Sequence, residues 1–177
     1  MKALLIIDMQ KDSFMLPVHD KDEIIKRINV LSDKFRQKGD KVIFIQHDGS
    51  REGSHVPFTE GWEILPSVDQ STSDRIIAKT ANDSFYRTPL KDELVRFGVD
   101  ELVITGSATD FCVDSTVKTA LTNDFNVTVI ADGHTTEDKP NLTAKQIIDH
   151  YNWVWKAMTP ANGRINVIGF EDFMRIL

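Results

Sequence analysis

Short runs of consecutive apolar residues recur along this 177-residue chain, each bounded by polar residues and separated from the next by a different pattern. The first run, Ala3 to Ile7, ends directly at Asp8. A strand that is apolar on both faces is typical of a parallel sheet with helices on both sides. Further strands are predicted at 41–46, 75–78, 101–105, 127–130 and 165–168.

Amphipathic helices are predicted between these strands. Apolar residues recur at helical spacing from Lys21 to Lys38, and Gly39 can take the left-handed conformation that ends a helix. Further helices are predicted from Thr88–Pro89 to Gly98, over 113–121, and from the capping box of Thr143 and Gln146 onward. The alternation predicts one α/β domain over residues 1–177, with a doubly wound, mainly parallel sheet of about six strands flanked by helices.

Composition excludes several classes of function. The formal net charge is −6 and no block of Lys and Arg is present, so a nucleic-acid binder is not expected. No apolar stretch reaches the twenty or so residues that span a bilayer, and nothing after Met1 resembles a secretory leader. The single cysteine cannot form an internal disulfide. We therefore expect a cytoplasmic protein that acts on a small molecule, with no nucleic-acid or membrane partner.

That cysteine, Cys112, lies where the strand at 101–105 gives way to the next helix. A free thiol has a pKa of roughly 8.5, and the positive end of a helix is expected to lower this pKa and favour the nucleophilic thiolate. The alternative is a small buried side chain without chemistry, because unpaired cysteines are often buried.

Three chemically useful side chains, Asp8, Lys79 and Cys112, each lie at or just after the carboxyl end of a predicted strand. Ligands of doubly wound sheets bind beyond these ends, so the three side chains should share one edge of the sheet. A nucleophile, a proton acceptor and a fixed cation are what attack on an acyl carbon requires. Taken separately, Asp8 could be a strand-end carboxylate facing water, and Lys79 a solvated surface amine.

The small residues Gly106, Ser107 and Ala108 connect this strand to the cysteine. Such a loop, leading into a helix, can aim backbone N–H groups at a developing oxyanion, and the amides of Ala108 and Cys112 are the predicted pair. For Gly106 alone, an ordinary tight turn is the simpler explanation.

Three segments combine these residues: Ile6 to Phe14, Lys79 to Phe85, and Thr105 to Val113. In this order they resemble the signature segments of the isochorismatase-like cysteine hydrolases, and the resemblance covers nearly the whole chain. It implies a catalytic triad of Asp8, Lys79 and Cys112, a cis peptide bond between Ser107 and Ala108, an acyl-enzyme on the cysteine, and a homo-oligomer.

Within that family, the presence of the cysteine favours a C–N bond of amide type as the target. Family nicotinamidases add a metal site with an Asp-x-His pair, whereas this chain has Gln46-His47-Asp48 with His55 beyond. We therefore expect no metal and no cofactor. The stretches 61–66, 132–136 and 152–153 are similar to a metal-free subgroup that includes streptothricin hydrolase-like enzymes.

The segment from His47 to Asp74 is long for a connection inside a domain, and such loops are often functional. Aromatic side chains in it and near the three segments could wall an apolar pocket, although core packing is the competing explanation for each. Substrate contacts are predicted for Phe14, His47, Trp62, Phe85 and Phe111.

Other functions remain open at this point. A thiol hydrolase could act on an ester or a lactam instead of a primary amide. A reactive thiol could also serve a binding or redox-sensing protein, although no second cysteine is present to resolve it. A nucleotide-binding module is disfavoured, because no Gly-x-Gly-x-x-Gly or Walker pattern follows the first strand. The identity of the substrate does not follow from the sequence.

Overall fold

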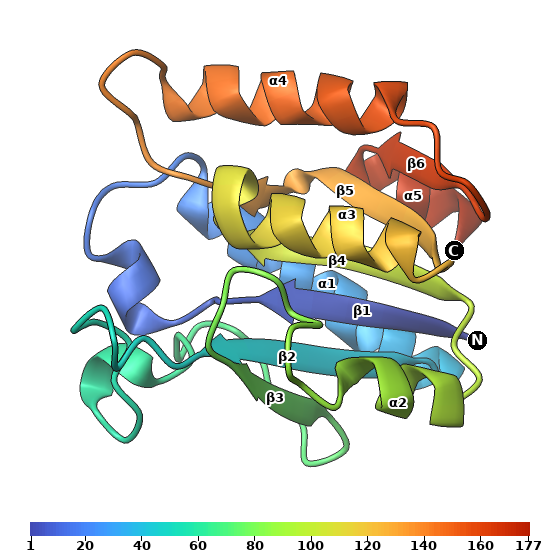
Figure 1. The fold of residues 1–177 in the computed structure, drawn as a ribbon, viewed down its shortest axis with the longest axis horizontal. Helices are drawn as coiled ribbons and strands as arrows, with labels where there is room; N and C mark the ends of the chain where they lie inside the picture. Colours follow the sequence, from blue (N-terminus) through green and yellow to red (C-terminus); the bar gives the residue numbers. More distant parts are fainter.

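Six parallel strands form one sheet in the order β3-β2-β1-β4-β5-β6 (Figure 1). In the computed structural model, every pair of neighbouring strands is parallel. The strands are β1 (Lys2–Ile7), β2 (Lys41–His47), β3 (Arg75–Lys79), β4 (Glu101–Ser107), β5 (Asn126–Thr135) and β6 (Ile165–Ile168). The predicted doubly wound sheet is confirmed.

Five α-helices cover the two faces of the sheet (Figure 1). They are α1 (Lys21–Lys38), α2 (Leu90–Arg96), α3 (Asp114–Thr122), α4 (Ala144–Ala157) and α5 (Phe170–Ile176). Helices α2, α3 and α4 pack on one face, and α1 and α5 pack on the other. None of these helices combines the length and the apolar character needed to cross a membrane.

The first strand shows why its sequence is apolar without interruption. Leu4 and Ile6 pack in the core under α1, whereas Leu5 and Ile7 pack in the core under α2, α3 and α4. All four side chains are fully buried. Burial of each contributes roughly 1.5–3 kcal/mol relative to exposure, so both layers of helices are held by this central strand.

Two helix ends match the sequence patterns. Gly39 follows α1 in a left-handed conformation, with φ of 75°, and its N–H donates to carbonyls of the last turn. Thr143 and Gln146 form the predicted capping box of α4, in which each side chain bonds the backbone N–H of the other residue. These local devices depend on few neighbours, which is why they can be read from the sequence.

Two other helices differ from expectation. The N-cap of α2 is Pro89, not Thr88, because Pro89 has ψ of 3° and the helical conformation begins one residue later. The Thr88 hydroxyl still accepts a hydrogen bond from the Leu90 N–H at 3.3 Å. Helix α5 was not predicted, because its seven residues are too few for a periodic pattern, yet its Phe173 is buried in the core.

Strand β5 runs to Thr135, well beyond its predicted end at Ile130. A register shift in its pairing with β4 places Gly106 opposite His134 and Ser107 opposite Thr135. The polar residues of this extension resemble a loop in the sequence, because their burial depends on the neighbouring strand. The extension brings His134 beside the connection that leads to Cys112.

The long segment from 48 to 74 is tied to the connection between β1 and α1. Gln10 pairs with Ile64 in an isolated antiparallel bridge, and the Leu65 N–H donates to the Met9 carbonyl at 2.9 Å. Leu65 and Val68 are buried in the core under α1. The segment therefore forms a fixed wall beside the carboxyl end of β1.

Gly106 is predicted to tolerate no side chain. Its φ is 117°, and a Cβ atom there would overlap the backbone of Ile7 on the adjacent strand. Gly106→Ala should lower the free energy of unfolding by more than about 3 kcal/mol, because strain and a backbone clash add together. Gly39→Ala is the control, since its φ is 75° but the space around it is open. That variant should lose about 1–2 kcal/mol. Equal losses in urea denaturation would contradict the predicted clash.

Candidate active site

The candidate site lies where the order of the strands reverses. From β1 the chain moves outward to β2 and β3, and then returns to β4 on the other side of β1. Ligands of doubly wound sheets bind in the crevice at this point, beyond the carboxyl ends of the strands. Ile7 is paired with Gly106, so Asp8 and Ser107, the next residue on each strand, lie side by side at the crevice.

Lys79, at the end of β3, connects the other two residues of the predicted triad. Its side chain is completely buried, and Nζ lies 2.7 Å from Asp8 Oδ2. The same Nζ lies 3.2 Å from Cys112 Sγ and donates a hydrogen bond to the Ala81 carbonyl at 3.0 Å. Because β2 separates β3 from β1 in the sheet, this long side chain spans one strand to reach Asp8. The structure therefore brings Asp8, Lys79 and Cys112 into one cluster.

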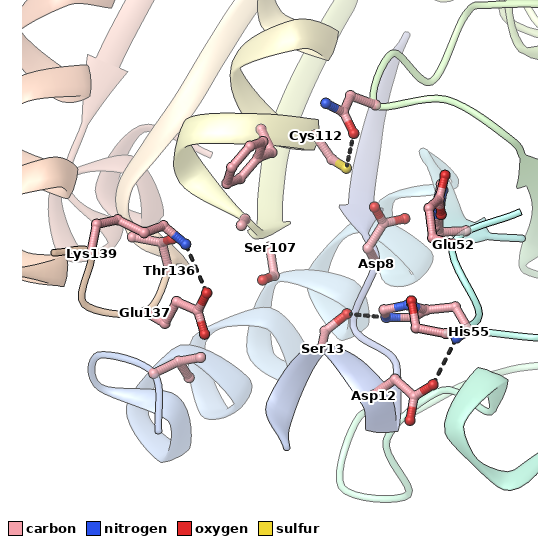
Figure 2. Close-up of a pocket in the computed structure, with 16 residues that line it drawn as sticks. Asp8, Asp12, Ser13, Glu52, His55, Ser107, Cys112, Thr136, Glu137 and Lys139 are labelled. Atoms are coloured by element: carbon pink, nitrogen blue, oxygen red, sulfur yellow. Dashed lines mark hydrogen bonds and ion pairs between the residues drawn. The ribbon is translucent and has the colours of Figure 1, made fainter. Parts of the chain in front are cut away.

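The Asp8 carboxylate has one paired and one free oxygen. Oδ2 pairs with Lys79, whereas Oδ1 is buried and has no hydrogen-bond partner. A buried carboxylate is costly unless it is paired, so the ammonium group of Lys79 is essential to its presence there. Asp8 lines the same cavity as Cys112, and its free oxygen can accept a proton (Figure 2).

Cys112 lies in a π-helical turn of five residues, Thr109–Val113, which precedes α3. The carbonyl of Ala108 accepts hydrogen bonds from the N–H groups of Phe111 and Val113, both at 3.1 Å. The peptide bond between Ser107 and Ala108 is cis. Ala108 and Cys112, whose amides form the predicted oxyanion hole, both line the cavity.

The pKa of the Cys112 thiol is shifted in the opposite direction to the one expected from the helix end. Burial raises the pKa of Cys112 to about 12, and the nearby Asp8 carboxylate raises it while the Lys79 ammonium lowers it. The largest cause of the shift is the loss of solvent around the sulfur. The resting group is therefore a neutral thiol, which accepts from Lys79 and donates to Asn82 Oδ1 at 3.7 Å.

The charge of Lys79 is secured by its neighbours. Burial lowers the pKa of its ammonium group, but the Asp8 carboxylate and the Cys112 sulfur raise that pKa by more, so the net pKa is raised. Lys79 therefore stays protonated at neutral pH and provides a permanent positive charge 3.2 Å from the sulfur.

A cavity of about 330 Å³ opens beside the cysteine. Figure 2 shows Asp12, Glu52 and His55 on one side of Cys112, and Glu137 and Lys139 on the other. The lining is mostly polar, and its apolar members are Val18, Ala108, Phe111 and Cys112. This differs from the apolar pocket expected from the aromatic residues of the sequence.

Two of the five predicted substrate contacts line this cavity, His47 and Phe111. His47 Nδ1 lies 3.4 Å from Lys79 Nζ, and Nε2 lies 2.8 Å from Glu52 Oε2. An ammonium group only donates and a carboxylate only accepts, so Nε2 carries the imidazole proton. Phe111 is partly exposed at the edge of the cavity. The Lys139 Nζ lies 5.2 Å from the centre of its ring.

The other three predicted contacts, Phe14, Trp62 and Phe85, do not line the cavity. Phe85 packs against the core under α2, α3 and α4, where its ring stacks on Phe125. Phe14 packs against the core under α1. Trp62 packs against the ring of Phe58. Core packing, the competing explanation, therefore accounts for Phe14 and Phe85, whereas Trp62 contacts an exposed ring outside both cores.

Several cavity residues were not singled out by the sequence. Asp12 and Asn82 lie within the segments that carry the family resemblance. Their positions in those segments are the sequence signal that could have identified them as cavity residues. Glu52 and Glu137 lie in irregular segments without any pattern. The additional lining residues are Asp12, Ser13, Val18, Glu52, Ser54, His55, Asn82, Thr136, Glu137 and Lys139.

Two histidines, His47 and His55, lie at the cavity. His47 and His55 have ring centres 5.7 Å apart, but no group of three or more His, Cys, Asp or Glu side chains is arranged to hold a metal ion. His55 Nε2 instead lies 2.9 Å from the Ser13 hydroxyl, and burial lowers the pKa of its imidazole.

Comparison with known proteins identifies the family of this chain. The family model described as the Isochorismatase domain matches residues 2–158. The chain belongs to the isochorismatase family. A solved structure titled as an isochorismatase family protein is 29% identical, with a TM-score of 0.85, and the match covers 95% of this chain and 98% of that one.

Two curated relatives bear names that describe a reaction. A streptothricin hydrolase from Streptomyces noursei is 35% identical over 78% of this chain and 56% of its own length. The nicotinamidase of Escherichia coli K12 is 29% identical over 75% of this chain and 82% of its own length. Matches to two streptothricin hydrolases span 56% and 51% of those proteins, so this chain corresponds to about half of each.

A third histidine, His134, lies in the extension of β5 and is 1% exposed. Its ring nitrogens lie 2.8 Å from the Thr109 hydroxyl and 3.1 Å from Asn152 Oδ1. Burial lowers the pKa of this imidazole to about 4. The ring is therefore neutral at neutral pH.

Removal of the buried cation should destabilise the fold strongly. Lys79→Met leaves the Asp8 carboxylate buried without a partner, so the free energy of unfolding should fall by about 3–5 kcal/mol. Asp8→Asn in the same chain removes the isolated charge and should restore part of the loss. Lys118→Met, which breaks a half-exposed pair with Asp114, should change it by less than about 1 kcal/mol. A Lys79→Met protein as stable as the wild type in urea would contradict the structure.

The neutral state of His134 predicts a dependence of stability on pH. Its ordinary pKa is 6.5 and its folded pKa is about 4, so between these values the unfolded chain binds more protons. The free energy of unfolding should therefore fall as pH falls through this window, by about 3 kcal/mol in full. The stability difference between wild type and His134→Gln should shrink by that order from about pH 7 to about pH 4. A difference that is independent of pH would show that His134 is not buried as a neutral ring.

Proposed function

We propose that this protein is a cysteine hydrolase that cleaves an amide-type C–N bond of a small molecule, with Cys112 as the nucleophile. The observation that carries the proposal is the position of Lys79 Nζ, 2.7 Å from Asp8 Oδ2 and 3.2 Å from Cys112 Sγ. Asp8 and Cys112 thus border one cavity of about 330 Å³, which suits a small substrate, and the buried Lys79 cation contacts both of them.

The first half of the reaction forms an acyl-enzyme. The thiol is neutral at rest, so its proton passes to Asp8 as the sulfur attacks the carbonyl carbon, and the free Oδ1 atom is the acceptor. The Lys79 ammonium stabilises the negative charge on the sulfur. The amides of Ala108 and Cys112 are the proposed donors to the carbonyl oxygen. Asp8 then returns the proton to the leaving nitrogen, and the C–N bond breaks.

The second half releases the acid. Water takes the place of the amine, and Asp8 accepts a proton from it as the water oxygen attacks the thioester carbon. The C–S bond breaks and the sulfur takes the proton back from Asp8. The substrate has then gained one water molecule, and Cys112 is again a neutral thiol. Lys79 remains charged throughout, since its partners raise its pKa.

The relatives support a C–N bond as the target. Their names describe a hydrolase that acts on streptothricin and an amidase that acts on nicotinamide. This chain has a thiol in a site with a proton acceptor and a cation, which is the equipment for acyl transfer. An ester or lactam would use the same groups, so these bonds are the comparison in the experiment below.

The redox-sensing alternative is disfavoured by the electrostatics of the thiol. A sensor depends on a thiolate that is present at rest and exposed to oxidant. Burial instead raises the pKa of Cys112 to about 12, and the chain holds no second cysteine. A site of this kind favours deprotonation coupled to attack on a bound substrate.

The proposal predicts an acyl adduct on Cys112. Incubation with panels of small amides, esters and lactams, followed by acid quenching and intact-mass measurement, should give an adduct with an amide and a matching release of ammonia or amine. Cys112→Ala should abolish the adduct and lower kcat/KM by at least about 1000-fold. Asp8→Asn should slow adduct formation by a similar factor, because it removes the proton acceptor.

Thr122→Val is a control in which a hydroxyl is removed at the far end of α3. It should leave both adduct formation and turnover unchanged, and circular dichroism should show the same fold for every variant. Undiminished hydrolysis by Cys112→Ala would overturn the proposed nucleophile. Adducts with esters alone would move the target away from C–N bonds, and adducts with lactams alone would move it from open-chain to cyclic amides.

A further inference from the structure

The turn that carries Cys112 is held in place by hydrogen bonds to neighbouring elements. Before the cysteine, Asp110 Oδ1 accepts a hydrogen bond from the Thr136 hydroxyl at 2.6 Å. After it, Asp114 Oδ1 accepts one from the indole N–H of Trp155 at 3.0 Å. These contacts hold the two flanks of the turn against the end of β5 and against α4. A turn of five residues has few bonds of its own, so its position depends on such contacts.

The deepest of these contacts joins Thr109, the first residue of the turn, to His134. The Thr109 hydroxyl lies 2.8 Å from Nδ1 of the imidazole, and both residues are at most 1% exposed. The other ring nitrogen, Nε2, lies 3.1 Å from Asn152 Oδ1. The imidazole edge packs against Trp155, with ring centres 5.1 Å apart. His134 is thus fixed by polar contacts at both nitrogens and by packing.

The hydrogen bonds around His134 permit one arrangement of protons. Asn152 Nδ2 donates to the Ala131 carbonyl at 2.9 Å, which directs its Oδ1 atom toward the imidazole. A carbonyl oxygen only accepts, so the imidazole proton is on Nε2. Because the ring is neutral, Nδ1 has a free lone pair and accepts a hydrogen bond from the Thr109 hydroxyl. No member of this chain of bonds can rotate without leaving a buried polar group unpaired.

We propose that His134 is a positioning residue for Cys112, and that its bond to Thr109 sets the turn so that the sulfur lies beside the Lys79 ammonium group. His134 does not line the cavity, so it would act on the reaction through Thr109 alone. The inference deepens the proposed function and rests on it for its catalytic readout. Displacement of a reacting atom by about 1 Å can cost about 100-fold in rate, so a modest shift of the turn is measurable.

Thr109→Val tests the bond directly, because it removes the hydroxyl with little change of side-chain shape. The turn should shift, and kcat for the amide identified above should fall by about 10-fold, while KM changes by less than about 2-fold because Thr109 does not line the cavity. Thr109→Ser retains the hydroxyl and should stay within about 3-fold of wild type. His134→Gln should lower kcat similarly, and the double variant should lose no more than the larger single loss.

The second readout is the rate of alkylation of Cys112 by iodoacetamide at about pH 8, followed by intact mass, and it needs no substrate. Burial and Asp8 hold the thiol protonated, so a loosened turn should lower its pKa and expose it. Thr109→Val should therefore be alkylated at least about 3-fold faster than wild type, although it hydrolyses more slowly.

Thr128→Val is the matched control. Thr128 is also buried on β5, and its hydroxyl donates to Glu101 at 2.8 Å, but it lies at the opposite end of that strand. It should lose stability without changing kcat or alkylation. Unchanged kcat and alkylation in Thr109→Val, or equal changes in Thr128→Val, would overturn the positioning role. If no amide is hydrolysed by the wild type, the proposed function fails, whereas the alkylation rates still decide whether His134 and Thr109 set the environment of the thiol.

Discussion

The ion pair between Lys79 and Asp8 is the interaction on which the rest of the site depends. It joins the carboxyl ends of β3 and β1 inside the protein, where neither charge would be stable alone. The same ammonium group contacts the Cys112 sulfur. One buried cation therefore connects the end of β1, the end of β3 and the turn after β4. Because one oxygen of Asp8 is committed to this pair, the other is left free for the proposed role of proton acceptor. One lysine therefore stabilises the buried carboxylate and, in the proposed reaction, also stabilises the negative charge on the sulfur.

Much of the fold could be predicted because its causes are local or periodic. The apolar run of β1 reflects burial on both faces, and the ends of α1 and α4 follow from Gly39 and from the Thr143–Gln146 capping box. The clustering of Asp8, Lys79 and Cys112 followed from one geometric rule, that the carboxyl ends of parallel strands share an edge. The family resemblance identified the same residues, and the structure brings them together.

The features that were missed depend on contacts between distant segments. Phe14, Trp62 and Phe85 were expected at the substrate, but an aromatic ring packs wherever apolar surface is nearest, which the sequence does not reveal. The direction of the Cys112 pKa was wrong because the helix end is local, whereas the loss of solvent around the sulfur comes from the whole fold. His134 resembled a loop residue, since the β5 extension exists only through its pairing with β4.

The long segment between β2 and β3 supplies Glu52, Ser54 and His55 to the cavity, but none of the three residues proposed to carry out the chemistry. Those three lie at strand ends or in the turn that follows β4. Insertions or substitutions in this surface loop can therefore change one wall of the cavity without disturbing Asp8, Lys79 and Cys112. Under the proposed mechanism, the architecture separates the residues that would select the molecule from those that would cleave its bond, so that selectivity could change while the chemistry stays the same.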